Sequence, residues 1–72
     1  MKMTSSQYMR IERAAGGLTC SNEHFVAICW LFLSLQGRKA VHRSTRHAWM
    51  RDGLSMLQRE RALHAQIMGV AQ

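Results

Sequence analysis

The side chains of this sequence with the widest chemistry are its two cysteines and four histidines. Thiolates and imidazoles suit zinc, and the candidate ligands are Cys20, His24, Cys29, His42 and His47. Their spacing contains neither a CxxC nor an HxxxH pair, from which local zinc-binding motifs are commonly built. Cys29 also lies inside an apolar run, where a buried thiol is ordinary. The sequence therefore predicts no metal site.

Nucleophilic catalysis has one candidate pair, Cys20 with His24 four residues later. Such a pair needs a third group to orient the base, and the sequence offers no evident one. It also offers no glycine-rich loop that would bind a phosphate. The acids are scattered over different segments, at Glu12, Glu23, Asp52 and Glu60. We therefore expect a binding protein and not an enzyme, with no cofactor and no small-molecule substrate.

The cysteine count and the apolar runs bear on the compartment. Two cysteines can form one disulfide at most, so we interpret both as thiols in a reducing compartment. The longest apolar run, 25–35, would extend about 16 Å as a helix, which is half of what a bilayer requires. It also begins too far from residue 1 to be a signal peptide. We expect a cytoplasmic protein without a membrane span.

The positive charge is concentrated in the second half of the sequence. Residues 1–36 hold three cations and two acids, whereas residues 37–72 hold seven cations and two acids, which is most of the net charge of +6. The stretch 38–51 has five cations and no acid. In a helix, Lys39, His42, Arg43 and Arg46 would share one face. The predicted contact residues are Arg38, Lys39, His42, Arg43, Arg46 and Arg51.

Three interpretations of this basic segment stay open. It can follow the phosphate backbone of a nucleic acid, with Ser44 and Thr45 as further donors. It can bind an acidic protein surface, or it can be a solvated face that only keeps the protein soluble. We favour nucleic acid. Five phosphate contacts on duplex DNA predict a slope of about −4 to −5 in log K against log salt.

The first two predicted elements are helices at about 5–15 and 22–36. Thr4 and Gln7 fit a capping box before the first helix, and Gly16 with Gly17 ends it. Ser21 is the best N-cap for the second helix, and Gly37 ends that one. No face of the second helix is polar between residues 25 and 33. A buried strand is the competing interpretation there, but the caps and the length favour a helix.

The third predicted element is a long amphipathic helix at about 44–69. Trp49, Met56, Leu63 and Val70 recur every seven residues, with Gly53, Glu60 and Ile67 at the complementary positions. Gly53 is the weak point, since glycine costs about 1 kcal/mol relative to alanine inside a helix. Either the helix breaks at Gly53, or Gly53 lies on the packed face and permits a close helix crossing. We favour the packed face because the apolar stripe keeps its phase.

These elements predict an all-α, three-helix protein with one domain, 1–72. Two narrow apolar stripes are too small to cover a second helix that is apolar all round. A helical homodimer is the simplest remedy; docking on a larger protein, or a monomer with better cover, remain alternatives. The predicted oligomer or partner interface comprises Phe25, Ile28, Trp30, Phe32, Trp49, Gly53, Met56, Leu63 and Ile67.

The leading functional hypothesis is a small basic regulator that contacts nucleic acid through residues 38–51. Trp49 is expected in the core and not as a platform for base stacking, because it heads the heptad stripe. The rival is a small inhibitor or adaptor, of the type that phages and mobile elements encode, which occludes a site on a host protein. A membrane-surface peptide fits less well, because the cations and the apolar face lie mostly on different segments.

Overall fold

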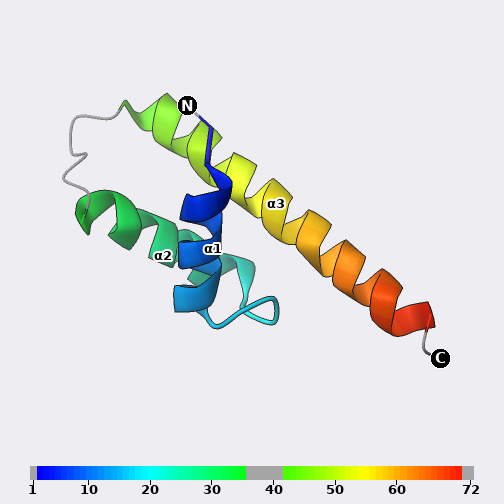
Figure 1. Cartoon of the computed structure of the whole chain (residues 1–72). Coiled ribbons are helices and arrows are strands. Elements are labelled where there is room, and N and C mark those ends of the chain that lie inside the picture. The colour runs from blue at the N-terminus through cyan, green and yellow to red at the C-terminus, as the bar shows by residue number, and fades with distance from the viewer. Residues whose placement is uncertain (1, 36–41, 71–72) are drawn as a thin grey trace.

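Three helices make up the computed structural model, which describes residues 2–35 and 42–70. They are α1 (Ser5–Ala15), α2 (Asn22–Leu35) and α3 (Arg43–Val70) (Figure 1). The described ranges contain no strand. The all-α, three-helix prediction is confirmed, with helix ends within about one residue of those expected. The strand alternative for α2 is wrong. The predicted end of that helix at Gln36 lies outside the described residues.

The helix ends follow the capping residues of the sequence. The Thr4 hydroxyl accepts from the Gln7 backbone N–H at 3.1 Å, and the Gln7 side-chain oxygen accepts from the Thr4 N–H at 3.0 Å. This is the predicted capping box. Gly16 ends α1 with φ 103°, a left-handed conformation that glycine adopts without strain. The Ser21 hydroxyl accepts from the His24 N–H at 3.1 Å and so caps α2.

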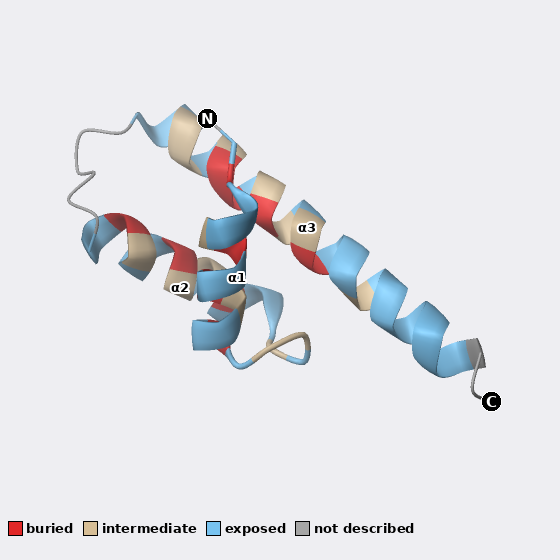
Figure 2. Cartoon of the chain, viewed as in Figure 1, coloured by how far each residue is buried: buried red, intermediate tan, exposed pale blue. Residues whose placement is uncertain are grey.

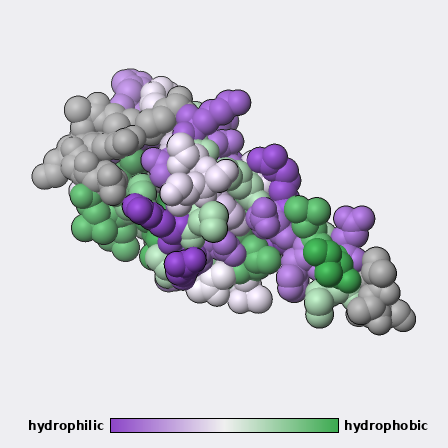
Figure 3. Space-filling view, viewed as in Figure 1, coloured by the Kyte–Doolittle hydropathy of each residue, from purple (hydrophilic) through white to green (hydrophobic). Residues whose placement is uncertain are grey.

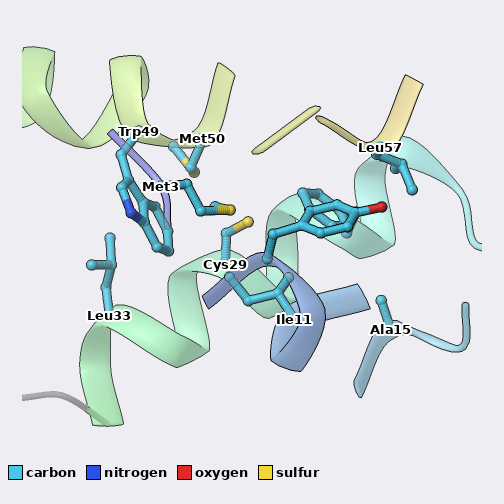
Figure 4. Packing of buried hydrophobic residues seen from close by; sticks show 10 residues of the cluster. Met3, Ile11, Ala15, Cys29, Leu33, Trp49, Met50 and Leu57 are labelled. Atoms are coloured by element: carbon cyan, nitrogen blue, oxygen red, sulfur yellow. The ribbon is translucent and has the colours of Figure 1, made fainter. Parts of the chain in front are cut away.

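One apolar core joins the three helices. Each helix contributes a stripe at the i, i+3 or i+4 spacing of a single helical face. Figure 4 shows the labelled side chains of all three helices and Met3 gathered in one cluster. The buried residues are Met3, Tyr8, Ile11, Ala15, Phe25, Cys29, Leu33, Trp49, Met50 and Leu57. The narrow α1 face expected from the sequence, Tyr8, Ile11 and Ala15, is confirmed.

α3 passes through Gly53 without a break, and Gly53 lies on the packed face. A Cβ atom at this position would be 2.5 Å from Cε of Met3 and 3.2 Å from a ring carbon of Phe25. Glycine therefore provides the room in which Met3 and Phe25 lie against the helix. The Met3 backbone N–H is fixed beside it by donation to the Asp52 carboxylate at 2.8 Å. The packed-face interpretation of Gly53 is confirmed, with side chains making the close approach.

α3 extends well beyond the other two helices. Its 28 residues make a rod of about 42 Å, while α1 and α2 reach about 16 and 21 Å. Residues 62–69 are all exposed, and the far end of α3 stands clear of α1 and α2 (Figures 1 and 2). The radius of gyration, 13.2 Å, exceeds the about 11 Å expected for this length. The surface of 5187 Å² likewise exceeds the about 4,600 Å² expected for this mass.

α2 is apolar all round, and its outer side is incompletely covered. Trp30, Leu31 and Leu35 are 36%, 58% and 85% exposed. The shortage of cover predicted for this helix is therefore present within the single chain. None of the described helices combines the length and the apolar content that crossing a bilayer demands.

Candidate functional site

A row of exposed basic side chains runs along the outer side of the first half of α3. Arg43, His47 and Arg51 are all exposed and lie four residues apart, so each is one turn above the last. The row extends over about 12 Å. Lys2 is also exposed, and it lines the same shallow hollow as Arg51. We call Lys2, Arg43, His47 and Arg51 the basic row.

One acid lies beside the basic row. Asp52 lines the hollow that Lys2 and Arg51 share. Its carboxylate accepts the Met3 backbone N–H, so part of its hydrogen-bonding capacity is taken up within the chain. The row keeps a net positive charge, because its cations outnumber this acid.

Arg46 does not belong to the exposed row, which corrects the predicted basic face. Its guanidinium lies 4.7 Å from the ring centroid of Trp30 on α2, in a cation–π contact. Its Nε atom is buried and has no hydrogen-bond partner among the described residues. Arg46 faces inward because it falls on the side of α3 that packs against α2. The expected grouping of Arg46 with Arg43 on one basic contact face is therefore wrong.

His42 lies at the start of α3, where its ring acts on the helix backbone. Nδ1 of His42 accepts from the Ser44 N–H at 3.1 Å and lies 2.8 Å from the Ser44 hydroxyl oxygen. An N-terminal N–H of the helix is thereby satisfied, as a side-chain cap does. The side chain remains exposed. Arg38 and Lys39, the other predicted contact residues, lie outside the described residues.

Arg61 holds the loop between α1 and α2, a role that the sequence reasoning missed. It donates to the Leu18 carbonyl at 2.8 Å, to the Asn22 side-chain oxygen at 2.9 Å and to the Cys20 carbonyl. These bonds connect residues about forty positions apart in the sequence. No local spacing signals such a contact. Beyond Arg61, residues 62–69 of α3 are all exposed.

The predicted interface residues divide into three groups. Phe25 and Trp49 are 0% exposed, and Gly53 is buried against Met3 and Phe25. These three belong to the interior of one chain, which corrects their assignment to a partner interface. The partly buried residues, Ile28, Phe32 and Met56, pack against the core. The remaining three, Trp30, Leu63 and Ile67, are exposed.

Trp49 is a core residue, as expected from the heptad stripe. Its ring stacks on Phe32 with centroids 6.1 Å apart. Its indole N–H donates to the Gln7 side-chain oxygen at 3.3 Å, so the capping box of α1 is connected to α3. With no exposed surface, Trp49 offers no platform to a nucleotide base.

Among the described residues, two apolar surfaces are open to solvent, and Figure 3 shows apolar atoms on both sides of the molecule, including the far half of α3. The first is a groove between α1 and α2, which we call the α1–α2 groove. It is lined by Arg10, Ala14, Ile28, Leu31, Phe32 and Leu35. The second lies on the far half of α3, where Leu63 and Ile67 are 53% and 70% exposed. We call Leu63 and Ile67 the α3 ridge; Met68, 56% exposed, lies beside it.

Burial acts on one thiol and on the one phenol of the described chain. Burial raises the pKa of the Cys29 thiol to about 12, so it stays protonated at neutral pH. Burial also raises the pKa of the Tyr8 hydroxyl to about 12, with Glu12 and Glu60 adding to the shift. Both cysteines are free, and Cys20 is partly exposed. In ranges 2–35 and 42–70, no three histidine, cysteine or acidic side chains gather as a metal site.

Neither a protein-family model, nor a curated protein, nor a solved structure matches this chain. Its function is therefore inferred from the exposed surfaces of the chain itself. The features that remain after the core is accounted for are the basic row, the α1–α2 groove and the α3 ridge.

Proposed function

We propose that this chain is a small basic regulator that binds nucleic acid through the sugar-phosphate backbone, with the basic row as the contact. The observation that carries the proposal is the exposure of Arg43, His47 and Arg51 at one-turn intervals, with Lys2 beside them. The opposite side of the same helix segment is fixed in the core by Trp49. The row is therefore presented on a rigid support.

The dimensions of the row suit a phosphate backbone. One strand of duplex DNA carries a charge about every 3.4 Å along its axis, so a row of about 12 Å faces three to four phosphates. Arginine and lysine contacts to phosphate fix position and do not read sequence. With Trp49 buried, the row presents no aromatic ring to the bases. Binding is expected to depend strongly on salt and weakly on base sequence.

Self-association is the second part of the proposal. The chain exposes more surface than a folded monomer of its mass is expected to expose, and part of the excess is apolar. A homodimer would cover apolar surface that the single chain leaves open. Pairing would also place two basic rows in one particle, so that one particle could contact two stretches of nucleic acid.

A salt titration with a generic duplex tests the nucleic-acid contact. The row contains three permanent cations, Lys2, Arg43 and Arg51, so these alone predict a slope of about −2.7 in log K against log salt per chain. Arg51→Gln should make the slope shallower by about 0.9 and weaken binding on every sequence alike.

Arg59→Gln is the matched control, because Arg59 is an exposed α3 cation outside the row. It should leave most of the binding intact. The proposal is wrong if the protein shifts neither DNA nor RNA at low salt, or if Arg59→Gln weakens binding as much as Arg51→Gln does.

The α1–α2 groove favours a second candidate function, an inhibitor or adaptor that binds a protein. Leu31 and Leu35, 58% and 85% exposed, line a groove with Arg10. An apolar helix face of another protein would fit such a groove. Capture of a partner from lysate that is lost with Leu31→Gln but kept with Arg51→Gln, in the absence of nucleic-acid binding, would favour this function over the first.

A further inference from the structure

The far half of α3 has little cover from the other described residues of the chain. Beyond Arg61, every residue from 62 to 69 is exposed. Leu63 and Ile67 still continue the apolar stripe that begins at Trp49, and Glu60 lies between Met56 and Leu63 in this stripe. Isolated helical segments of this length are marginal in water, because tertiary packing supplies most of the stability of a short helix. A protein surface that packs on the α3 ridge would therefore stabilise this segment of the helix.

Charge argues against some occupants of the α3 ridge and is compatible with a second copy of this chain. Residues 62–70 contain no acid, lysine or arginine, although the chain carries a net charge of +6. Two copies that meet along this segment bring no like charges together. A polyanion or an anionic membrane surface would find no cation here to bind. The segment is apolar and neutral in the way that suits a second, equally basic copy of this chain.

The charge of Glu60 and the volume of the α1–α2 part of each copy favour one direction of pairing. A parallel pair would place each residue opposite its own copy, which sets Glu60 against Glu60 and both α1–α2 bodies at one end. An antiparallel pair places the α1–α2 parts of the two copies at opposite ends. It also moves the two Glu60 side chains apart along the pair. It also brings Ile67 of the second copy opposite a hollow lined by Ser5, Met56, Arg59, Glu60 and Leu63.

We propose that two copies pair antiparallel through the α3 ridge, with the two-fold axis near Leu63, so that the dimer presents its two basic rows on opposite sides. The sidedness follows from helical geometry. His47 lies 16 residues before Leu63, a rotation of about 160° at 3.6 residues per turn. If the ridge of each copy faces the other copy, each row faces away from it. With one row on each side, such a dimer bridges two nucleic-acid segments. This consequence rests on the proposed function.

Cross-linking tests the direction of pairing. In a Cys20→Ser background, Leu63→Cys places two thiols near the axis, whereas Ile67→Cys places them about 12–17 Å apart along it. The native Cys29 is buried and should not react. A short bis-maleimide should link Leu63→Cys into a dimer and leave Ile67→Cys largely unlinked. Linking of both variants would mean a parallel pair, and linking of neither would mean no pairing here; either result overturns the proposal.

The solution mass tests the pairing without any nucleic acid. Light scattering should give twice the subunit mass of 8.3 kDa for the intact chain and 8.3 kDa for the Leu63→Gln, Ile67→Gln double variant. Leu35→Gln is the matched control, an exposed leucine off the ridge, and it should stay dimeric. All of these positions are exposed, so circular dichroism should show an intact core. A subunit mass for the intact chain at tens of micromolar would overturn the proposal.

A bridging assay tests the opposed rows. One duplex is fixed to beads, a second fluorescent duplex is added, and retention through the protein is measured. The double variant should lose at least about fivefold in retention while binding a single duplex within about twofold. The opposed arrangement of the rows is wrong if the intact chain and the double variant retain the second duplex equally. It is also wrong if an intact dimer binds duplex but retains no second duplex. If the chain binds no duplex at all, the proposed function fails, while mass and cross-linking still decide the pairing.

Discussion

The two halves of α3 share one apolar spacing but differ in burial. In the first half, Trp49 is 0% and Met50 is 5% exposed. In the second half, Leu63 and Ile67 continue the spacing yet are 53% and 70% exposed. Figure 2 shows the change along the helix, from buried segments beside α1 and α2 to an exposed far end.

The lengths of the helices explain the difference. α1 and α2, at about 16 and 21 Å, cover the first part of a rod that is about 42 Å long. The spacing of apolar residues therefore predicts which face of a helix packs. It does not predict whether the cover comes from the same chain.

The largest effect on the free energy of unfolding should come from a substitution of Trp49, which lies in the covered half of α3. Trp49→Ala removes a fully buried ring, its stacking on Phe32 and its hydrogen bond to Gln7. We expect a loss of about 3–5 kcal/mol in the free energy of unfolding, enough to unfold much of so small a domain. Urea denaturation followed by circular dichroism measures it.

Leu63→Ala is the matched change in the open half. At concentrations where the chain is monomeric, it should alter the free energy of unfolding by no more than about 0.5 kcal/mol. A loss as large as that of Trp49→Ala would mean that the far half of α3 is packed within the single chain, and the contrast between the halves would be wrong.

Arg61 lies at the border between the halves and should give the next largest effect. Arg61→Ala removes donors to Leu18, Cys20 and Asn22, which leaves loop carbonyls without their partner. Because the group is partly exposed, we expect a loss of about 1–3 kcal/mol in the free energy of unfolding. Its exposed neighbour Arg59, changed to alanine, should cost no more than about 0.5 kcal/mol. Equal losses would show that Arg61 does not hold the loop.

The two glycines of α3 provide a smaller test of the same contrast. Gly53→Leu must displace Met3 and press on Phe25, so overpacking should cost about 1–3 kcal/mol despite the better helix propensity. Gly69→Ala meets nothing within 4 Å and should stabilise the helix by up to about 1 kcal/mol. Thermal unfolding of both variants compares them. The same sign of change at both positions would contradict the assignment of Gly53 to the packed face.

Local signals in the sequence predict the helices well. Thr4, Gln7, Gly16 and Ser21 are in the expected places, because caps depend on residues only a few positions apart. The placement of Trp49 in the core is likewise confirmed, since the heptad spacing fixes its face. For the same reason, the sequence identifies α3 as one continuous helix through Gly53.

Contacts between distant residues were not predictable in this way. Arg46 faces Trp30, and Arg61 reaches Leu18, because of how the helices pack, which no local pattern encodes. Three cations and His42 at helical spacing predict one basic face, but packing against α2 turns Arg46 inward. Phe25 was assigned to a partner for a related reason: the cover that Met3 and Gly53 give it comes from segments far apart in the sequence.

The smallest expected effect concerns the buried hydroxyl of Tyr8 on the covered side. The pKa of Tyr8 is raised from 10.0 to about 12, first by burial, so the folded chain keeps a proton that the unfolded chain loses. Its contribution to stability is therefore complete below pH 10 and is lost as the pH rises through about 12.

Tyr8→Phe removes this dependence and also an oxygen with no hydrogen-bond partner in the described chain. Urea denaturation at pH 8 to 11 should show the wild type losing stability relative to Tyr8→Phe above pH 10, while the two differ by no more than about 1 kcal/mol at pH 8. Parallel pH profiles for the two proteins would mean that the hydroxyl ionises as freely in the folded chain as in the unfolded one, and that the space around the Tyr8 ring, beside Phe25, is open to water.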